Sequence, residues 1–260
     1  MIHLQHVDLI YSSTDGTDVH ALEGIDLQVA ENEFLVIVGP SGCGKSTLLK
    51  LIVGLLRPTR GAVMYRGRAV EDTIQEVGMV YQSPVLLPWR SVLNNVLLPI
   101  EILRRDAKVY AEEAAKLLEM AGLAAFAHKT PRELSGGMQQ RVALCRALIT
   151  DPPVLLMDEP FAALDALTRD EMGQELLRLW EEHRKTVVFV THSIPEAVLL
   201  GDRVVVMSPR PGRIVRDIPI DLPRPRTTPK QLGPAYTEYV EGIREIIYSF
   251  KRERDAAPAA

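Results

Sequence analysis

The sequence contains few cysteines, few aromatic residues and no long apolar stretch. Cys43 and Cys145 are its two cysteines, which excludes a disulfide-rich scaffold and is typical of a reducing compartment. No apolar run approaches the ~18 residues that a membrane-spanning helix requires. The first residues also lack the charged and apolar regions of a signal peptide. We therefore expect a cytoplasmic protein without a transmembrane segment of its own.

An excess of basic residues is absent as well. Lys and Arg total 30 against 34 Asp and Glu, so the formal net charge is -4. Proteins dedicated to nucleic-acid binding usually carry a strong positive charge, and we expect no nucleic-acid partner here. Apolar residues make up 47% and charged residues 25%, values that exclude a disordered or collagen-like chain.

Short apolar runs recur along the chain and are separated by polar stretches with helical patterns. Each run has four or five residues and almost no polar interruption, as in strands buried on both faces of a parallel sheet. Their alternation with helical segments predicts an α/β fold. The five runs are Phe34–Val38, Val77–Val80, Val154–Met157, Val187–Val190 and Val204–Met207.

Two other regions have different patterns. Residues 2–11 and 21–29 alternate apolar and polar side chains, which predicts a small antiparallel β subdomain before the parallel core. Between Gln82 and Asp151 no strand pattern occurs. Residues from about 83 to about 150 are therefore expected to form an inserted α-helical subdomain.

The end of the chain is rich in proline and arginine from Pro209 onward. This composition predicts a loop-rich C-terminal tail over roughly residues 216–260, with a last helix near residues 238–252. A regulatory appendage, a dimer contact and simple packing all remain open as its role. At ~150 residues per domain, residues 1–260 are expected to form a single domain that carries these additions.

A glycine-rich motif follows the first buried strand. Residues 39–46 read GPSGCGKS and fit the phosphate-loop pattern G-x-x-x-x-G-K-[ST], between a strand and a helical pattern that begins at Lys45. In such a loop, backbone N–H groups bind phosphate, Lys45 reaches the terminal phosphates, and the Ser46 hydroxyl binds Mg²⁺. Cys43 occupies a variable position, so its side chain is expected to pack. The predicted ATP-binding residues are Gly39, Pro40, Ser41, Gly42, Cys43, Gly44, Lys45, Ser46 and Thr47.

Two adjacent acids end the apolar run at residues 154–157. Asp158 is predicted to hold Mg²⁺, and Glu159 to polarise the attacking water. Adjacent carboxylates at the end of a buried strand are costly unless a cation or a polar network compensates them. Alone, this pair would indicate a solvated turn, but the phosphate loop upstream favours a nucleotide site.

A second glycine-containing helix start lies at residues 134–141, which read LSGGMQQR. A serine followed by two glycines can bind an anion at a helix N-terminus, or can be a helix cap with flexible glycines. One nucleotide needs one phosphate loop. A second anion site therefore implies a second nucleotide, or one that is shared with another copy of the chain.

LSGGMQQR resembles the signature sequence of the ATP-binding cassette (ABC) ATPases, and further motifs match that family in order over about residues 1–215. The resemblance implies a P-loop NTPase (RecA-like) core that hydrolyses ATP with Mg²⁺. It also implies a head-to-tail dimer in which the signature of one copy contacts the ATP of the other. The signature residues would be Leu134, Ser135, Gly136, Gly137, Met138 and Gln139.

The same resemblance assigns roles to isolated residues. Tyr11 resembles the aromatic residue that stacks on adenine, and His192 the switch histidine that contacts the γ-phosphate. Gln82 resembles the Q-loop glutamine, and Asp165 lies in a D-loop whose usual first residue, Ser, is replaced by Ala163. The implied catalytic residues are Glu159, His192, Gln82 and Lys45, and the implied metal ligands are Ser46, Gln82 and Asp158.

Two segments resemble one branch of bacterial ABC importers, those for nitrate, sulfonates and taurine. They are LLPWRSV at residues 86–92 and MSPRPGRI at residues 207–214. The apolar residues of the first could form an exposed docking patch for a membrane subunit, or could pack inside the helical insertion. Because the membrane and solute-binding subunits select the solute, this chain does not identify it.

The sequence thus predicts the ATP-hydrolysing subunit of an importer at the cytoplasmic face of the membrane. Its expected partners are a second copy, integral-membrane permease subunits and, indirectly, a solute-binding protein. An ABC ATPase that serves DNA repair or the ribosome is one alternative, although such proteins usually carry long insertions or two cassettes. A phosphate-loop metabolic kinase is another, but it would have no use for LSGGMQQR.

Overall fold

The computed structural model of the chain describes residues 1–12, 16–226 and 229–256, and it consists of two compact units. Met1–Gln75 and Thr186–Ala260 form the first unit, and Glu76–Lys185 form the second. Both units combine parallel strands with helices. The predicted α/β class is therefore confirmed.

The parallel strands of the first unit are those that the apolar runs predict. Strand β3 (Phe34–Val38) pairs in parallel with β8 (Thr186–Thr191) and with β9 (Arg203–Met207). Every residue of β3 and β8 is buried, as expected of strands covered on both faces. Strand β10 (Ile214–Pro219) adds an antiparallel edge to β9 within the segment predicted as loop. Its sequence is half polar and its side chains are partly exposed, so no apolar run signals it.

The predicted N-terminal antiparallel sheet is present and larger than expected. Strand β1 (Ile2–Tyr11) lies between β2 (Val19–Val29) and β4 (Arg60–Tyr65), and β5 (Arg68–Ala69) extends the sheet beyond β4. In β1 the side chains alternate between buried and more exposed positions, which matches the alternation in the sequence. Strands β4 and β5 are not predicted from the sequence, because they are short and their residues, RGAVMY and RA, do not alternate regularly between apolar and polar.

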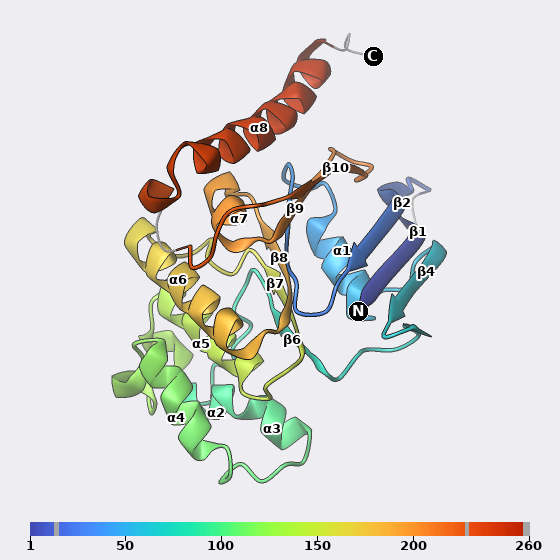
Figure 1. Cartoon of the computed structure of the whole chain (residues 1–260). Helices are drawn as coiled ribbons and strands as arrows, with labels where there is room; N and C mark the ends of the chain where they lie inside the picture. The colour runs from blue at the N-terminus through green and yellow to red at the C-terminus, as the bar shows by residue number, and fades with distance from the viewer. Residues whose placement is uncertain (13–15, 227–228, 257–260) are drawn as a thin grey trace. The chain divides into compact units, whose positions relative to one another are not determined.

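The described residues of the first unit form three helices. They are α1 (Lys45–Ile52), α7 (Ile194–Leu200) and α8 (Pro229–Ala256), which is red in Figure 1. Helix α8 begins before the predicted start near residue 238 and is interrupted at Gly233, whose φ is 65°. Proline fits the first turn of a helix because its missing N–H would have no partner there. Pro234 can therefore open the longer part of α8, although in the sequence it reads as a helix breaker.

The second unit contains one parallel strand pair and most of the helices. Strand β6 (Val77–Val80) pairs with β7 (Val154–Asp158). All of residues 83–150 are described, and they form helices without any strand. An apolar core joins these helices, with Val96, Ile100, Leu118 and Val142 fully or almost fully buried. The helices are α2 (Val92–Val96), α3 (Leu98–Ile102), α4 (Ala111–Met120), α5 (Gly136–Leu148) and, after β7, α6 (Ala166–His183), with short 3-10 turns at Ala124–Phe126 and Pro131–Glu133.

Within the described residues, no helix combines the length and the apolar character that crossing a membrane would require.

Candidate functional site

The phosphate loop connects β3 to α1 and depends on glycine for its shape. Gly42 and Gly44 have positive φ angles of 75° and 102°, which side chains with a Cβ rarely adopt. A Cβ on Gly44 would lie 2.6 Å from Cδ2 of Leu22, and one on Gly39 would lie 2.9 Å from the carbonyl oxygen of Met207. A loop of this kind turns successive N–H groups toward a common side, where an anion can bind.

Lys45 is the first residue of α1, and its side chain is only 6% exposed. Its Nζ donates hydrogen bonds to the carbonyl oxygens of Gly39, at 2.9 Å, and Pro40, at 3.0 Å. Carbonyl oxygens satisfy the donors but do not neutralise the charge, and a buried charge is costly without a counter-ion. A phosphate group in the loop would supply that negative charge.

Cys43 lies inside the loop and is fully buried. Burial raises the pKa of its thiol above the ordinary value. The thiol is therefore protonated at neutral pH, and its part in the loop is packing, as the sequence indicates.

The loop between β9 and β10, residues 208–213, packs against the phosphate loop. Its Gly212 donates an N–H to the carbonyl oxygen of Ala21 at 2.9 Å and accepts one from Glu23 at 3.0 Å. A Cβ built on Gly212 would lie 2.0 Å from the carbonyl oxygen of Cys43. The two backbones are thus in direct contact, and no other residue fits at position 212 without a shift of the phosphate loop.

Arg210 completes this contact from the solvent side. Its guanidinium donates from Nε at 3.4 Å and from Nη2 at 3.3 Å to the carbonyl oxygen of Gly42. The 208–213 loop is itself held closed, because the Ser208 N–H donates to the carbonyl oxygen of Arg213 and the Ser208 hydroxyl accepts the N–H of Arg213. The sequence motif at residues 207–214, noted above only for its resemblance, therefore supports the phosphate loop.

A substitution at Gly212 tests this support. The Gly212→Ala variant is expected to bind ATP about tenfold more weakly, because overpacking costs about 1–3 kcal/mol and would be relieved by moving the phosphate loop. Titration with a fluorescent ATP analogue measures the change. Gly242→Ala on α8 is the matched control, since a Cβ there meets nothing within 4 Å. Equal affinities in both variants would show that the contact is irrelevant to binding.

Two further predicted residues belong to the first unit. The hydroxyl of Tyr11, at the end of β1, lies 3.2 Å from Oγ1 of Thr47, and the residue is 40% exposed. The aromatic ring is thus close to the phosphate loop and still accessible to a base. His192 follows β8 and is exposed. Tyr11 and the phosphate loop are the predicted site residues that are brought together in this unit.

In the second unit, β7 ends in the two predicted acids. Asp158 is its last residue and is 6% exposed, and Glu159 follows in a half-buried position. Gln82 donates from Nε2 to Oε2 of Glu159 at 3.5 Å, so the structure brings these two residues together. Glu159 has a φ of 46°, a left-handed conformation that is uncommon for a glutamate and that clusters at functional sites.

The predicted signature residues begin helix α5. The Ser135 hydroxyl accepts the N–H of Met138 at 3.3 Å and so caps the helix. A Cβ on Gly136 would meet nothing within 4 Å, which leaves the helix start open to a ligand, whereas one on Gly137 would lie 2.9 Å from Cδ2 of Leu164. The signature and the D-loop segment that contains Leu164 therefore pack together.

The side chains of Gln139, the last predicted signature residue, and of Asp165 in the D-loop make local structural hydrogen bonds. The Gln139 amide donates to the carbonyl oxygens of Pro131 and Leu134, so its side chain folds back onto the preceding turn. Asp165 caps α6 and accepts the N–H and the hydroxyl of Thr168, and these hydrogen bonds lower the pKa of its carboxyl. Contact of Gln139 with a nucleotide would require its side chain to leave this arrangement, while Asp165 shapes the backbone that follows the D-loop.

Comparison with known proteins agrees with this arrangement. A family model described as "ABC transporter" matches residues 22–162, more than half of the chain. The chain belongs to the ABC transporter family. The family includes an uncharacterized ABC transporter ATP-binding protein of Methanocaldococcus jannaschii, 52% identical over 233 residues that cover 90% of this chain and 86% of that protein. The taurine import ATP-binding protein TauB of Rhizobium johnstonii is 43% identical over 262 residues, covering 99% of this chain and 100% of that protein.

A solved structure of an ABC cassette has the same fold. It is a dimeric, post-hydrolysis cassette bound to ADP and phosphate, with a TM-score of 0.77 and 36% sequence identity, covering 85% of this chain and 99% of that one. The predicted P-loop core and the ATPase activity are confirmed by these matches. The individual residue roles remain predictions.

Proposed function

We propose that this ABC ATPase energises solute import through a membrane transporter of the nitrate, sulfonate and taurine type. The observation that carries the proposal is the 43% identity to a taurine import ATP-binding protein over nearly the full length of both chains. Residues 1–260 would act as a single nucleotide-binding domain at the cytoplasmic face of the membrane. Which solute is imported is a property of the partner subunits.

ATP binding is assigned to the phosphate loop. The N–H groups of residues 39–47 and the buried ammonium of Lys45 would hold the β- and γ-phosphates, and the ring of Tyr11 would stack on adenine. Mg²⁺ prefers oxygen donors and usually takes few of them from the protein. The hydroxyl of Ser46, the carboxylate of Asp158 and the amide oxygen of Gln82 fit that preference. Bound there, the ion would offset the negative charge of the phosphates.

Hydrolysis is assigned to Glu159. Its carboxylate would accept a proton from the attacking water, while the hydrogen bond from Gln82 fixes its position. His192 would contact the γ-phosphate and orient it, and Lys45 would stabilise the charge that develops on the phosphoryl oxygens. Each group then has the role that its motif predicts.

A second copy of the chain is the proposed source of the other half of the nucleotide contact. The N-terminus of α5 is open at Gly136, and a helix N-terminus attracts phosphate. The dimeric state of the related cassette supports a head-to-tail dimer in which residues 134–139 of one copy reach the ATP of the other. Binding of ATP would hold the copies together, and its hydrolysis would release them.

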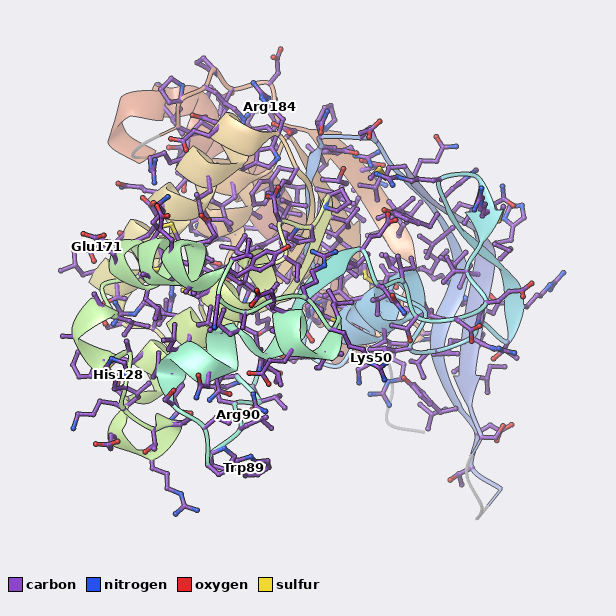
Figure 2. All side chains as sticks on the ribbon, turned by 90° about the horizontal axis from the view of Figure 1, so that it is seen from below. Lys50, Trp89, Arg90, His128, Glu171 and Arg184 are labelled. Atoms are coloured by element: carbon purple, nitrogen blue, oxygen red, sulfur yellow. The ribbon has the colours of Figure 1, made fainter. Side chains whose placement is uncertain are left out.

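The segment between Gln82 and α2 is the proposed docking surface for a permease subunit. Val85 is 60% exposed and Trp89 is 75% exposed, whereas Leu86 packs against the helical core. The predicted apolar cluster is thus divided between the interior and the surface. Trp89 projects outward in Figure 2. Arg146 donates to the carbonyl oxygens of Pro84 and Val85 at 2.8 Å, which fixes the shape of the segment.

Trp89→Ala tests the docking surface. The variant is expected to keep the ATPase activity of the isolated chain and to lose most of its association with the membrane fraction, because buried tryptophans often dominate interface energies. Leu55→Ala, which truncates another exposed apolar side chain, serves as the control. Membrane association measured by co-sedimentation should fall only for Trp89→Ala, and equal retention of both variants would contradict the assignment.

Co-purification of the tagged chain from native membranes tests the function as a whole. An integral-membrane subunit and a solute-binding protein are the expected companions, and a direct ligand assay on the binding protein would then identify the solute. Recovery of ribosomes or nucleic acid without a membrane subunit would overturn the transport proposal. It would favour the alternative of a non-transport ABC ATPase.

A further inference from the structure

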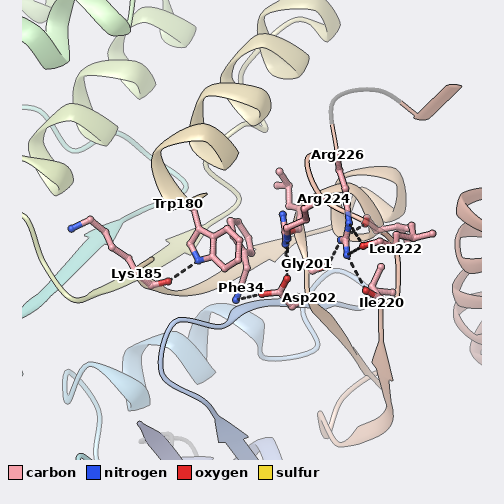
Figure 3. Close-up of polar contacts among 11 residues, drawn as sticks. Phe34, Trp180, Lys185, Gly201, Asp202, Ile220, Leu222, Arg224 and Arg226 are labelled. Carbon is pink, nitrogen blue, oxygen red and sulfur yellow. Dashed lines mark hydrogen bonds and ion pairs between the residues drawn. The ribbon is translucent and has the colours of Figure 1, made fainter. Parts of the chain in front are cut away.

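The C-terminal tail contains a buried arginine that the nucleotide chemistry does not explain. Arg226 is only 3% exposed, and within the described part of the chain its guanidinium makes five hydrogen bonds, all to backbone carbonyl oxygens (Figure 3). Burial lowers its pKa to about 10, so the group is still charged at neutral pH. Burying a charged group costs free energy, and hydrogen bonds from a charged donor are stronger than neutral ones. The guanidinium of Arg226 therefore connects firmly the segments whose carbonyl oxygens it binds.

Two of those carbonyl oxygens mark the end of helix α7. Nη1 of Arg226 donates to Val198 at 3.2 Å and to Gly201 at 2.5 Å. Cations stabilise helix C-termini, where carbonyl groups lack helical partners. The other acceptors, Ile220 and Leu222, belong to the tail itself. Arg226 thus joins the tail to the C-terminal end of α7.

Helix α8 contacts α7 at the opposite end. The hydroxyl of Tyr236, a buried residue of α8, donates to the carbonyl oxygen of Pro195 at 3.2 Å. Pro195 lies in the first turn of α7. The tail therefore holds α7 at both ends, and we name Arg226 and Tyr236 together with their acceptors the α7 latch.

The first turn of α7 is hydrogen-bonded to Thr191 and Ser193, the two neighbours of His192 in the sequence. The Thr191 hydroxyl donates to Oε2 of Glu196 at 2.7 Å and accepts the N–H of Ser193 at 3.0 Å. The Ser193 hydroxyl in turn accepts the N–H of Glu196 at 3.4 Å. His192 lies between two residues that are hydrogen-bonded to Glu196 in the first turn of α7, so a shift of α7 would act on the backbone on both sides of His192.

We propose that Arg226 and Tyr236 are positioning residues for His192, through which the tail sets the geometry of the switch histidine. The proposal rests on the assignment of His192 to the γ-phosphate made above. The tail then has a regulatory role. A partner that displaces α8 would displace α7 and so change the rate of ATP hydrolysis.

The test uses the full chain with Tyr236→Phe and Arg226→Lys. Both variants are expected to shift the NMR signals of the His192 imidazole, identified by their loss in His192→Gln. We also expect kcat to fall about tenfold with KM for ATP unchanged, since a displacement of about 1 Å can cost a large rate factor and the phosphate loop is untouched. Tyr239→Phe is the matched control, because that hydroxyl accepts the N–H of Asp221 within the tail.

Unchanged His192 signals, or an unchanged kcat, in both Tyr236→Phe and Arg226→Lys would overturn the proposal. So would equal effects from Tyr239→Phe. If Arg226→Lys does not fold, Tyr236→Phe decides alone, since it removes one hydroxyl. Full turnover by His192→Gln would instead refute the assigned role of His192, and the NMR shifts would still report whether the latch positions the histidine.

Discussion

Replacement of Glu159 by glutamine is expected to lower ATP turnover by about 10²–10⁴-fold, the usual contribution of a general base. The amide cannot accept the proton of the attacking water. It can still accept the hydrogen bond that Gln82 donates at 3.5 Å, so the geometry around position 159 should persist. ATP binding, assigned to residues 39–47, should therefore be retained. Steady-state phosphate release measures turnover, and titration with a fluorescent ATP analogue measures binding.

Glu171→Gln is the matched control for this experiment. Glu171 lies on α6 in the same unit, is exposed, and is labelled in Figure 2. Glu171→Gln removes one negative charge, as Glu159→Gln does, but at a position away from the end of β7. ATP turnover should therefore be unchanged. Turnover by Glu159→Gln at the level of the unmodified chain would show that another group activates the water.

The fold could be predicted where burial leaves a local pattern. Strands β3, β7 and β8 are buried at every position and have apolar residues through their middle, because both of their faces are covered. That pattern is visible in a few residues of sequence. Strand β10 and the start of helix α8 could not be located in the same way, although the predicted helix near residues 238–252 lies within α8. The former is a half-exposed edge strand, and the latter contains Gly233 and Pro234, which read as helix breakers.

The site residues likewise differ in whether the sequence alone could predict them. Lys45, Asp158 and Glu159 were predicted because their chemistry fixes both residue type and local spacing. The supporting contacts of Gly212 and Arg226 were not predicted, because both act on backbone carbonyl oxygens of distant segments. Gly212 and Cys43 lie far apart in the sequence, and a contact between them leaves no periodic signal there. Such residues become visible only when backbone clearances and buried charges are known.

Replacement of Lys45 by methionine is expected to weaken ATP binding about 100-fold, because charged hydrogen bonds contribute about 1.5–3 kcal/mol each and the ammonium would contact two phosphates. The unliganded protein should not lose stability. Methionine fills much of the same buried space, and the variant no longer buries a charge whose hydrogen bonds go to two carbonyl oxygens and the Cys43 sulfur, none of which carries a negative charge. Lys45→Met is therefore expected to weaken ATP binding without lowering the stability of the unliganded protein. A variant that failed to fold would lose both.

Thermal unfolding with and without ATP and Mg²⁺ separates these effects. In the unmodified chain the nucleotide should raise Tm, since a ligand that binds the folded state stabilises it by RT ln(1 + [L]/Kd). In Lys45→Met the Tm without nucleotide should be equal or higher, and the shift on adding ATP should disappear. Lys50→Met, one turn and a half further along the chain near the end of α1, removes a half-buried lysine and should keep the full shift. A lower Tm of Lys45→Met without nucleotide would contradict this prediction. It would mean that the buried ammonium stabilises the folded protein even when no ATP is bound.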